Sequence, residues 1–378
     1  MSTRYAFVIH EQPPSVVLDA GQQPREISPL WLRERTQAPD QLEAMTRQRL
    51  FDSHAIDVAL TLESASRIDE HQVALAFSDG HHETFDLRVL ADELADDTAT
   101  FPAAEPWDAS LDQARVRFDW RRVLEEPSYF RDSLEAYLRY GYLILYGVPT
   151  DPERILQVGR HYGYVKETNF GRYFEVYSRP SGNDLAYRSV ALGPHTDNPY
   201  RNPVPGIQLL HCLVNETSGG LSTLADSLKV LGRLCEEDPD GYALLKTTPV
   251  RFRFVDAGTE LVTQRTMIQT DDDGHPTGVH YSPRLDALPL LSDAQTRQFH
   301  RARQRLGELL ADPTYEARFT LDAGELMLFD NSRVLHGRTS YDPSEGHRHL
   351  QGCYLDIDGP RERFASLLKH HASIEEVA

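Results

Sequence analysis

Apolar positions that alternate with polar ones mark the first hundred residues. Residues 73–77 show this alternation, Asp79-Gly80 follows, and residues 82–85 resume it. An Asp-Gly pair between two alternating runs predicts a β-hairpin, because the turn needs positive φ values that glycine adopts at no steric cost. We therefore expect a small β-rich domain over residues 1–96.

Helical periodicity and unbroken apolar runs take over beyond residue 112. Residues 97–112, which hold Pro102, Pro106 and several alanines, are typical of a linker. The pattern predicts helices over residues 128–140 and over residues 292–310, the latter with Ser292 as N-cap, and another helix that is capped by Thr150-Asp151-Pro152 and has the proline in its first turn. It predicts strands over residues 142–146, 207–214, 317–321, 326–329 and 349–357. Helices followed by clustered short strands indicate a second domain over residues 113–378 that is α+β and mostly β, with helices packed outside an antiparallel core.

Composition narrows the function classes. Of the 378 residues, 39 are basic and 58 acidic, and the net charge of -19 argues against general nucleic-acid binding and against docking on anionic membranes. No apolar run is long enough to cross a bilayer, and the N-terminus lacks the pattern of a secretory signal. Cys212, Cys235 and Cys353 are odd in number and far apart, which predicts a reducing, cytoplasmic location and no zinc cluster of thiolates.

A His-x-Asp tripeptide and a distant histidine are the candidate metal ligands. Side chains of residues i and i+2 in a strand point to one face, so we expect His195 and Asp197 to hold two adjacent positions of one ion. His336 would complete the two-histidine, one-carboxylate triad of non-haem Fe(II) oxygenases, which leaves three positions open for a co-substrate and O2. The tripeptide alone is weak evidence, because a surface or N-cap histidine gives the same pattern by chance.

The chain after His336 supplies a cation. Arg348 follows that histidine by twelve residues, inside a strand-like run that ends at Tyr354. A guanidinium in this place can bind one carboxylate of a dicarboxylate whose other end chelates the metal.

Together these stretches resemble the γ-butyrobetaine hydroxylase branch of the taurine-dioxygenase-like Fe(II)/2-oxoglutarate oxygenases, over nearly the whole chain. The matching segments are His195-Thr196-Asp197, residues 205–212, Asp330-Asn331, residues 335–338, residues 348–354 and, for the small N-terminal domain of that branch, Trp31-Leu32-Arg33 and the Asp79 hairpin. The resemblance implies a double-stranded β-helix (jelly roll) with outer helices as the catalytic domain and, commonly, a homodimer. It assigns Fe(II) to His195, Asp197 and His336, and 2-oxoglutarate to Arg348, with Leu210 as a wall of its pocket.

One departure from this branch concerns zinc. Relatives carry zinc-binding cysteines soon after the Trp-Leu-Arg segment and a histidine in the later hairpin, whereas Thr36, Ala38 and Gln41 stand at the cysteine positions here. His81 or His82 alone cannot hold zinc tetrahedrally, so we expect no structural zinc.

The resembled enzymes oxidise small quaternary ammonium compounds, and a trimethylammonium group is bound by aromatic faces. The aromatic residues that match or adjoin the cage positions are Phe170, Phe174, Tyr187, Tyr354 and Tyr200. Each of them, taken singly, is equally well explained by core packing.

The anionic end of the substrate is expected near Asp184, His280, Ser282 and Arg284. An arginine with a hydroxyl and a histidine suits a tetrahedral, highly charged anion, which favours [2-(trimethylamino)ethyl]phosphonate as substrate; a surface ion pair is the other interpretation of Arg284. γ-Butyrobetaine is the alternative substrate, and trimethyllysine fits less well because its amino-acid head group needs recognition of its own.

Two hypotheses of other classes compete with this one. A betaine-binding protein without catalysis would use the same scaffold, but the intact triad and Arg348 argue against it. A zinc hydrolase would use the same triad, but no obvious general-base glutamate lies beside the histidines.

Overall fold

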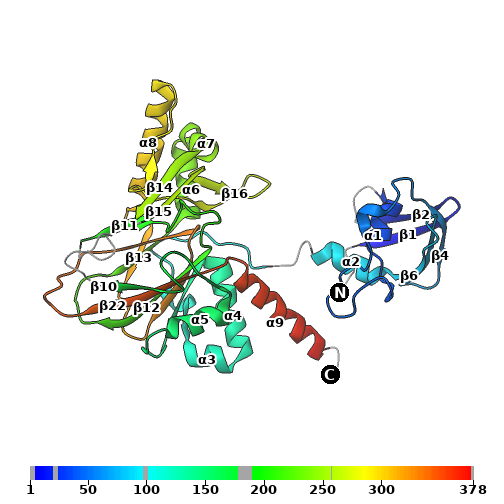
Figure 1. The fold of residues 1–378 in the computed structure, drawn as a ribbon, viewed down its shortest axis with the longest axis horizontal. Coiled ribbons are helices and arrows are strands. Elements are labelled where there is room, and N and C mark those ends of the chain that lie inside the picture. Colours follow the sequence, from blue (N-terminus) through cyan, green and yellow to red (C-terminus); the bar gives the residue numbers. More distant parts are fainter. Residues whose placement is uncertain (1–4, 20–23, 97–100, 178–189, 257, 376–378) are drawn as a thin grey trace. The chain divides into compact units, whose positions relative to one another are not determined.

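The computed structural model describes residues 5–19, 24–96, 101–177, 190–256 and 258–375 (Figure 1). The chain divides into two compact units, residues 1–100 and residues 101–378, and each has a hydrophobic core of its own. Within the described ranges, no helix is long and apolar enough to cross a bilayer.

The N-terminal unit packs small antiparallel sheets against short helices. Its elements are β1 (Ala6–Glu11), β2 (Pro14–Asp19), β3 (Arg25–Glu26), α1 (Pro29–Glu34), a 3-10 turn (Ser53–Ala55), β4 (Leu62–Arg67), β5 (Gln72–Phe77), β6 (His82–Asp86) and α2 (Leu87–Asp96). The strands are ordered β1-β2-β3 and β4-β5-β6, and Leu32, Phe77, Phe85 and Leu90 form the core. The predicted hairpin is confirmed, since β5 pairs antiparallel with β6 and Gly80 has a φ of +84°.

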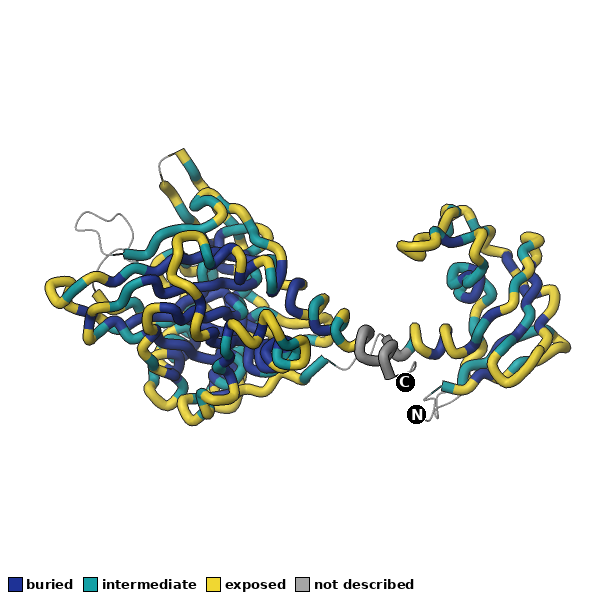
Figure 2. Tube along the Cα trace, turned by 90° about the horizontal axis from the view of Figure 1, so that it is seen from below, coloured by how far each residue is buried: buried dark blue, intermediate teal, exposed yellow. Residues whose placement is uncertain are grey.

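Two sheets form the frame of the larger unit, and their strands pair antiparallel except for one parallel pair at an edge. Their strands are β7 (Arg117–Asp119), β8 (Tyr142–Tyr146), β9 (Val165–Lys166), β10 (Phe174–Tyr177), β11 (Leu192–His195), β12 (Ile207–Asn215), β13 (Ser222–Asp226), β19 (Glu316–Phe319), β20 (Leu326–Asp330), β21 (Val334–Arg338) and β22 (Arg348–Leu355). One sheet has the order β10-β22-β12-β20-β8-β7, with β9 beside β22, and the other has the order β11-β21-β13-β19. Buried side chains of both sheets, such as Leu209, Leu224 and Leu328, share one core, and Figure 2 shows the buried strands in dark blue. This arrangement is the double-stranded β-helix that the resemblance implied.

Helices cover the sheets, as the sequence pattern predicted (Figure 1). One group comprises a 3-10 turn (Gln113–Arg115), α3 (Trp120–Glu125), α4 (Pro127–Tyr140), α5 (Arg154–Tyr162) and α9 (Gly359–Glu375). A second group comprises α6 (Ser227–Glu237), α7 (Pro239–Thr247) and α8 (Asp293–Leu310), and it packs with the short strands β14 (Val250–Asp256), β15 (Thr259–Arg265), β16 (Ile268–Thr270), β17 (Pro276–Val279) and β18 (Asp286–Ala287). The helix with Ser292 as N-cap is confirmed, because the Ser292 hydroxyl accepts a hydrogen bond from the backbone N–H of Gln295.

Two local expectations were wrong. The segment predicted as a linker is partly built into the larger unit, because Trp107 is buried, lies 4.9 Å from the Tyr142 ring and donates its indole N–H to the carbonyl of Tyr140. The helix expected to have Pro152 in its first turn begins only at Arg154. Its N-cap, Glu153, has a φ of 64° and donates its backbone N–H to Gln351 Oε1, a contact with a distant strand that local sequence does not encode.

Candidate metal centre and substrate cavity

Strand pairing brings the two candidate histidines together. β11 pairs antiparallel with β21 in a register that sets His195 directly opposite His336, and the two rings lie 4.2 Å apart between centroids. Directly opposed residues of an antiparallel pair have neighbouring side chains, so the sheet itself supplies two ligands from segments far apart in the chain.

Asp197 completes the cluster from outside the strand. β11 ends at His195, so the expectation that one strand carries both residues of the tripeptide was wrong; Asp197 lies in the bend that follows. Its Oδ1 is nevertheless 3.3 Å from His195 Nε2. One ligand atom from each of His195, Asp197 and His336 lies within 4.8 Å of the other two, and this is the one such group of three or more in the part of the chain that the structure describes.

The charge states of this cluster suit a divalent cation. Burial lowers the pKa of His336 to about 3, so this imidazole is neutral near pH 7 and its lone pair is available to a metal. Burial opposes ionisation of Asp197, but the hydrogen bond and charge of His195, the proximity of His336 and the hydroxyl of Tyr354 hold its pKa well below the usual range. Nitrogen donors with one carboxylate are the donor set of non-haem Fe(II) sites.

Arg348 lies at the start of β22 and is buried. Its Nη2 donates to the carbonyl of Gly220 at 3.3 Å, while its Nε is buried with no hydrogen-bond partner. Burial and the nearby charge of Arg338 lower the pKa of Arg348 to about 10. No carboxylate among the described residues forms an ion pair with it. A buried guanidinium without a counter-ion is costly, so this position suits the carboxylate of a bound anion.

Leu210, which the resemblance assigns to a wall of the 2-oxoglutarate pocket, is buried on β12, beside β22. Gly352 faces it across the pair, and a Cβ at this glycine would lie 2.3 Å from Phe174 Cζ and 3.1 Å from Leu210 Cδ2. Only glycine therefore allows the Phe174 ring to lie against β22 next to Leu210.

A cavity of about 350 Å³ opens beside the triad, and aromatic rings form one of its walls. Of the expected cage residues, Phe170, Phe174, Tyr200 and Tyr354 line it, and Tyr187 lies outside the described residues. Phe254 on β14, which the sequence did not indicate as a site residue, stacks on Tyr200 at 4.7 Å and meets the edge of Phe170 at 5.9 Å. The alternation Val250, Phe252, Phe254 was a usable strand signal, but it does not indicate which cavity the strand borders.

The residues expected at the anionic end of the substrate separate into two groups. Ser282 and Arg284 line the cavity, and the charge of Arg284 contributes to the lowered pKa of His336. His280 does not line it, because one ring nitrogen lies 3.0 Å from Arg265 Nη1 and the other 3.2 Å from the carbonyl of Thr266. The structure therefore does not place His280 in the cavity wall with Ser282 and Arg284, and Asp184 lies outside the described residues.

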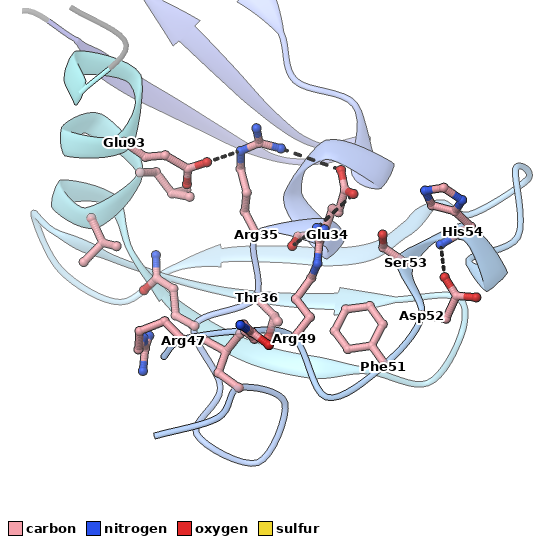
Figure 3. A pocket seen from close by; sticks show the side chains of 15 residues that line it. Glu34, Arg35, Thr36, Arg47, Arg49, Phe51, Asp52, Ser53, His54 and Glu93 are labelled. Carbon is pink, nitrogen blue, oxygen red and sulfur yellow. Dashed lines mark hydrogen bonds and ion pairs between the residues drawn. The ribbon is translucent and has the colours of Figure 1, made fainter. Parts of the chain in front are cut away.

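The N-terminal unit holds a second cavity of about 800 Å³ (Figure 3). Four of its charged side chains form ion pairs: Arg35 Nε lies 2.8 Å from Glu93, and Arg49 Nη1 lies 2.8 Å from Glu34. The charges of Arg35 and Arg49 are therefore balanced within the unit, unlike the charge of Arg348.

Comparison with known proteins agrees with this geometry. The family model described as "Taurine catabolism dioxygenase TauD, TfdA family" matches residues 99–354. The chain is 32% identical over 336 residues to a gamma-butyrobetaine dioxygenase of Pseudomonas sp. (strain AK-1), covering 87% of each, and 28% identical over 353 residues to the mitochondrial trimethyllysine dioxygenase of Rattus norvegicus, covering 87% of this chain and 80% of that one.

A solved structure shares the fold. An asparagine oxygenase in complex with Fe(II), 2S,3S-3-hydroxyasparagine and succinate superposes with a TM-score of 0.51 at 19% identity, covering 70% of this chain and 89% of the other. With the family match and the His195, Asp197 and His336 cluster, this shows that the chain belongs to the taurine catabolism dioxygenase TauD, TfdA family and is an Fe(II)- and 2-oxoglutarate-dependent dioxygenase.

Proposed function

We propose that this dioxygenase hydroxylates a small trimethylammonium compound, and that its substrate is [2-(trimethylamino)ethyl]phosphonate. The observation that carries the choice of substrate is Arg284, which lines the cavity next to Ser282. Among the described residues it has no hydrogen bond or ion pair of its own, whereas Arg253 in the same wall pairs with Glu260 at 2.9 Å. A guanidinium free to bind, beside a hydroxyl, suits a tetrahedral dianion.

The aromatic wall supports the cationic half of the proposal. Phe174 and Tyr354 lie 5.3 Å apart between ring centroids, and Phe170 lies 6.3 Å from Phe174. A trimethylammonium group has no N–H to donate, so rings that present their faces at this spacing attract it and keep water away. The names of the relatives, a gamma-butyrobetaine and a trimethyllysine dioxygenase, favour the same class of substrate.

Each residue then has a positioning task. His195, Asp197 and His336 would hold Fe(II), which supplies oxidation of a C–H bond by O2 when 2-oxoglutarate is present. Arg348 would bind the far carboxylate of 2-oxoglutarate, with Leu210 against its carbon chain. The aromatic wall and the Ser282–Arg284 pair would hold the two ends of the substrate, which fixes one C–H bond relative to the metal.

The test is turnover with Fe(II), 2-oxoglutarate and a panel of trimethylammonium acids, read as product mass and succinate. We expect the phosphonate to be hydroxylated, and Arg284→Ala to lose about 100-fold in kcat/KM for it, as expected for a lost charge-assisted contact of a few kcal/mol. Arg253→Ala is the matched control and should lose far less. Efficient use of γ-butyrobetaine with neglect of the phosphonate would make the carboxylate enzyme the correct assignment, and binding without succinate release would indicate a betaine-binding protein.

A further inference from the structure

The Asp330-Asn331 motif has no task in the function described so far, yet Asn331 is fully buried next to the metal cluster. Its Oδ1 accepts the backbone N–H of Asp197 at 2.8 Å. Its Nδ2 donates to the carbonyl of Asp197 at 2.9 Å and to the carbonyl of Pro205 at 3.0 Å. The Asn331 amide thus binds the backbone N–H and carbonyl of Asp197, the candidate ligand that does not lie on a strand.

The carboxylate of Asp197 is held as well. Tyr354 donates its hydroxyl to Oδ2 at 2.8 Å, while Oδ1 faces His195 Nε2. Tyr354 is buried on β22, and its ring packs against Phe174 in the cavity wall. The ring of this tyrosine therefore faces the space for substrate, and its hydroxyl faces the ligand side chain.

We propose that Asn331 and Tyr354 are positioning residues of the metal centre. Asn331 fixes the backbone of Asp197, and the Tyr354 hydroxyl occupies Oδ2, so that Oδ1 alone is presented to the metal. This inference rests on the assignment of His195, Asp197 and His336 as metal ligands. Coordination through one oxygen leaves three positions open on a six-coordinate ion, and coordination through both would remove one of them.

The ring and the hydroxyl of Tyr354 have different roles, which substitution can test separately. Tyr354→Phe keeps the ring and removes the hydroxyl, so it should affect the metal and leave the aromatic surface in place. Asn331→Ala removes the backbone contacts of Asp197. A residue with a purely structural task would change the stability of the fold, but not the metal affinity of the folded protein or the coordination number of the metal.

The experiment has three measurements: the affinity of the full-length protein for Mn(II) by calorimetry without O2, the visible spectrum of bound Co(II), and the thermal unfolding of the metal-free protein. The Co(II) spectrum depends on which ligands the metal has and how they are arranged. We expect both variants to bind Mn(II) about 10- to 100-fold more weakly, the usual effect of removing a group that orients a ligand. For Tyr354→Phe we also expect a changed Co(II) spectrum, because Oδ2 becomes free to take one of the open positions and so alters the ligand set of the metal.

Two control variants match the chemistry that is removed. Tyr173→Phe deletes a phenol that donates to Glu153 at 3.2 Å, and Asn215→Ala deletes an amide that donates to the carbonyl of Leu321 at 3.1 Å. Both controls should bind Mn(II) like the wild type. If Tyr354→Phe has wild-type affinity and a wild-type Co(II) spectrum, the proposal is overturned, whatever the folding of Asn331→Ala. If the wild type binds no metal, the ligand assignment itself falls.

Discussion

Glu83 in the N-terminal unit and Asp197 in the larger unit both lie beside a histidine, but their surroundings differ. The Glu83 carboxylate accepts hydrogen bonds from the Thr36 hydroxyl at 2.6 Å and from the backbone N–H of Gln37, and lies 2.8 Å from His81 Nε2. Both of its oxygens are thereby engaged by protein donors. Asp197 has one oxygen bound to Tyr354, and the other faces a second candidate ligand beside an open cavity.

Two buried arginines repeat this contrast. Arg33 lies 2.9 Å from Asp79 and over the ring of Phe51, so its charge is balanced within the unit. Arg348 has no such acid within the described ranges. Residue type alone therefore does not identify a binding site. What distinguishes Arg348 from Arg33 is a buried charge with no acidic partner among the described residues.

The largest expected effect distinguishes Asp197 from Glu83. Asp197→Ala and His336→Ala each remove a ligand from a minimal set, so we expect succinate formation coupled to hydroxylation to fall below detection and Fe(II) affinity to drop by more than about 100-fold. Metal titration and succinate release measure both. Glu83→Ala should retain metal and turnover, and full activity of Asp197→Ala without added ligands would contradict the assignment.

Arg348→Ala tests the second pair. Loss of a charge-assisted contact of about 1.5–3 kcal/mol should raise the KM for 2-oxoglutarate about 10- to 150-fold, with a much smaller change in the KM for the trimethylammonium substrate. Steady-state kinetics with each substrate varied in turn gives both values. Arg33→Ala is the control and should leave both unchanged; equal effects of Arg348→Ala on both would place this residue elsewhere.

Glu83→Gln tests whether Glu83, unlike Asp197, has a structural role. The network around Glu83 occupies the region where Thr36 and Gln41 stand at cysteine positions of zinc-binding relatives. We expect the substitution to destabilise the N-terminal unit by about 1–3 kcal/mol, because buried donors lose a charged acceptor. Chemical unfolding followed by fluorescence measures this loss. We also expect metal analysis of the wild type to find no stoichiometric zinc, and a tightly held zinc in each chain would refute this interpretation.

The smallest effect is a pH dependence of the larger unit. Burial lowers the pKa of His280 to about 3 and that of His211 to about 4. The unfolded chain therefore binds more protons below pH 6.5, and stability is lost as pH falls toward 4. Between pH 7 and pH 6 each histidine should contribute about 0.7 kcal/mol. Unfolding curves at both pH values measure it, and an unchanged pH slope in His280→Asn would contradict the assignment.

Sequence by itself determined the features that depend on neighbouring residues. The Asp79-Gly80 hairpin, the helix capped by Ser292 and the strand over residues 142–146 follow from periodicity, capping and turn chemistry, and all are present. The identities of the candidate metal ligands and of Arg348 followed from motifs and a family resemblance, because those residue types are what the chemistry needs.

Tertiary structure alone decided how these pieces meet. The register of β11 and β21 sets His195 against His336, and burial of the common core selects that register, which no local pattern reports. In the packed structure β11 ends before Asp197. Asn331 binds the backbone of Asp197, and Tyr354 binds its carboxylate. The same packing also buried Trp107, turned His280 toward Arg265 and set Phe254 into the cavity wall. Periodicity indicates which face of an element is apolar, and only the assembled core determines what that face contacts.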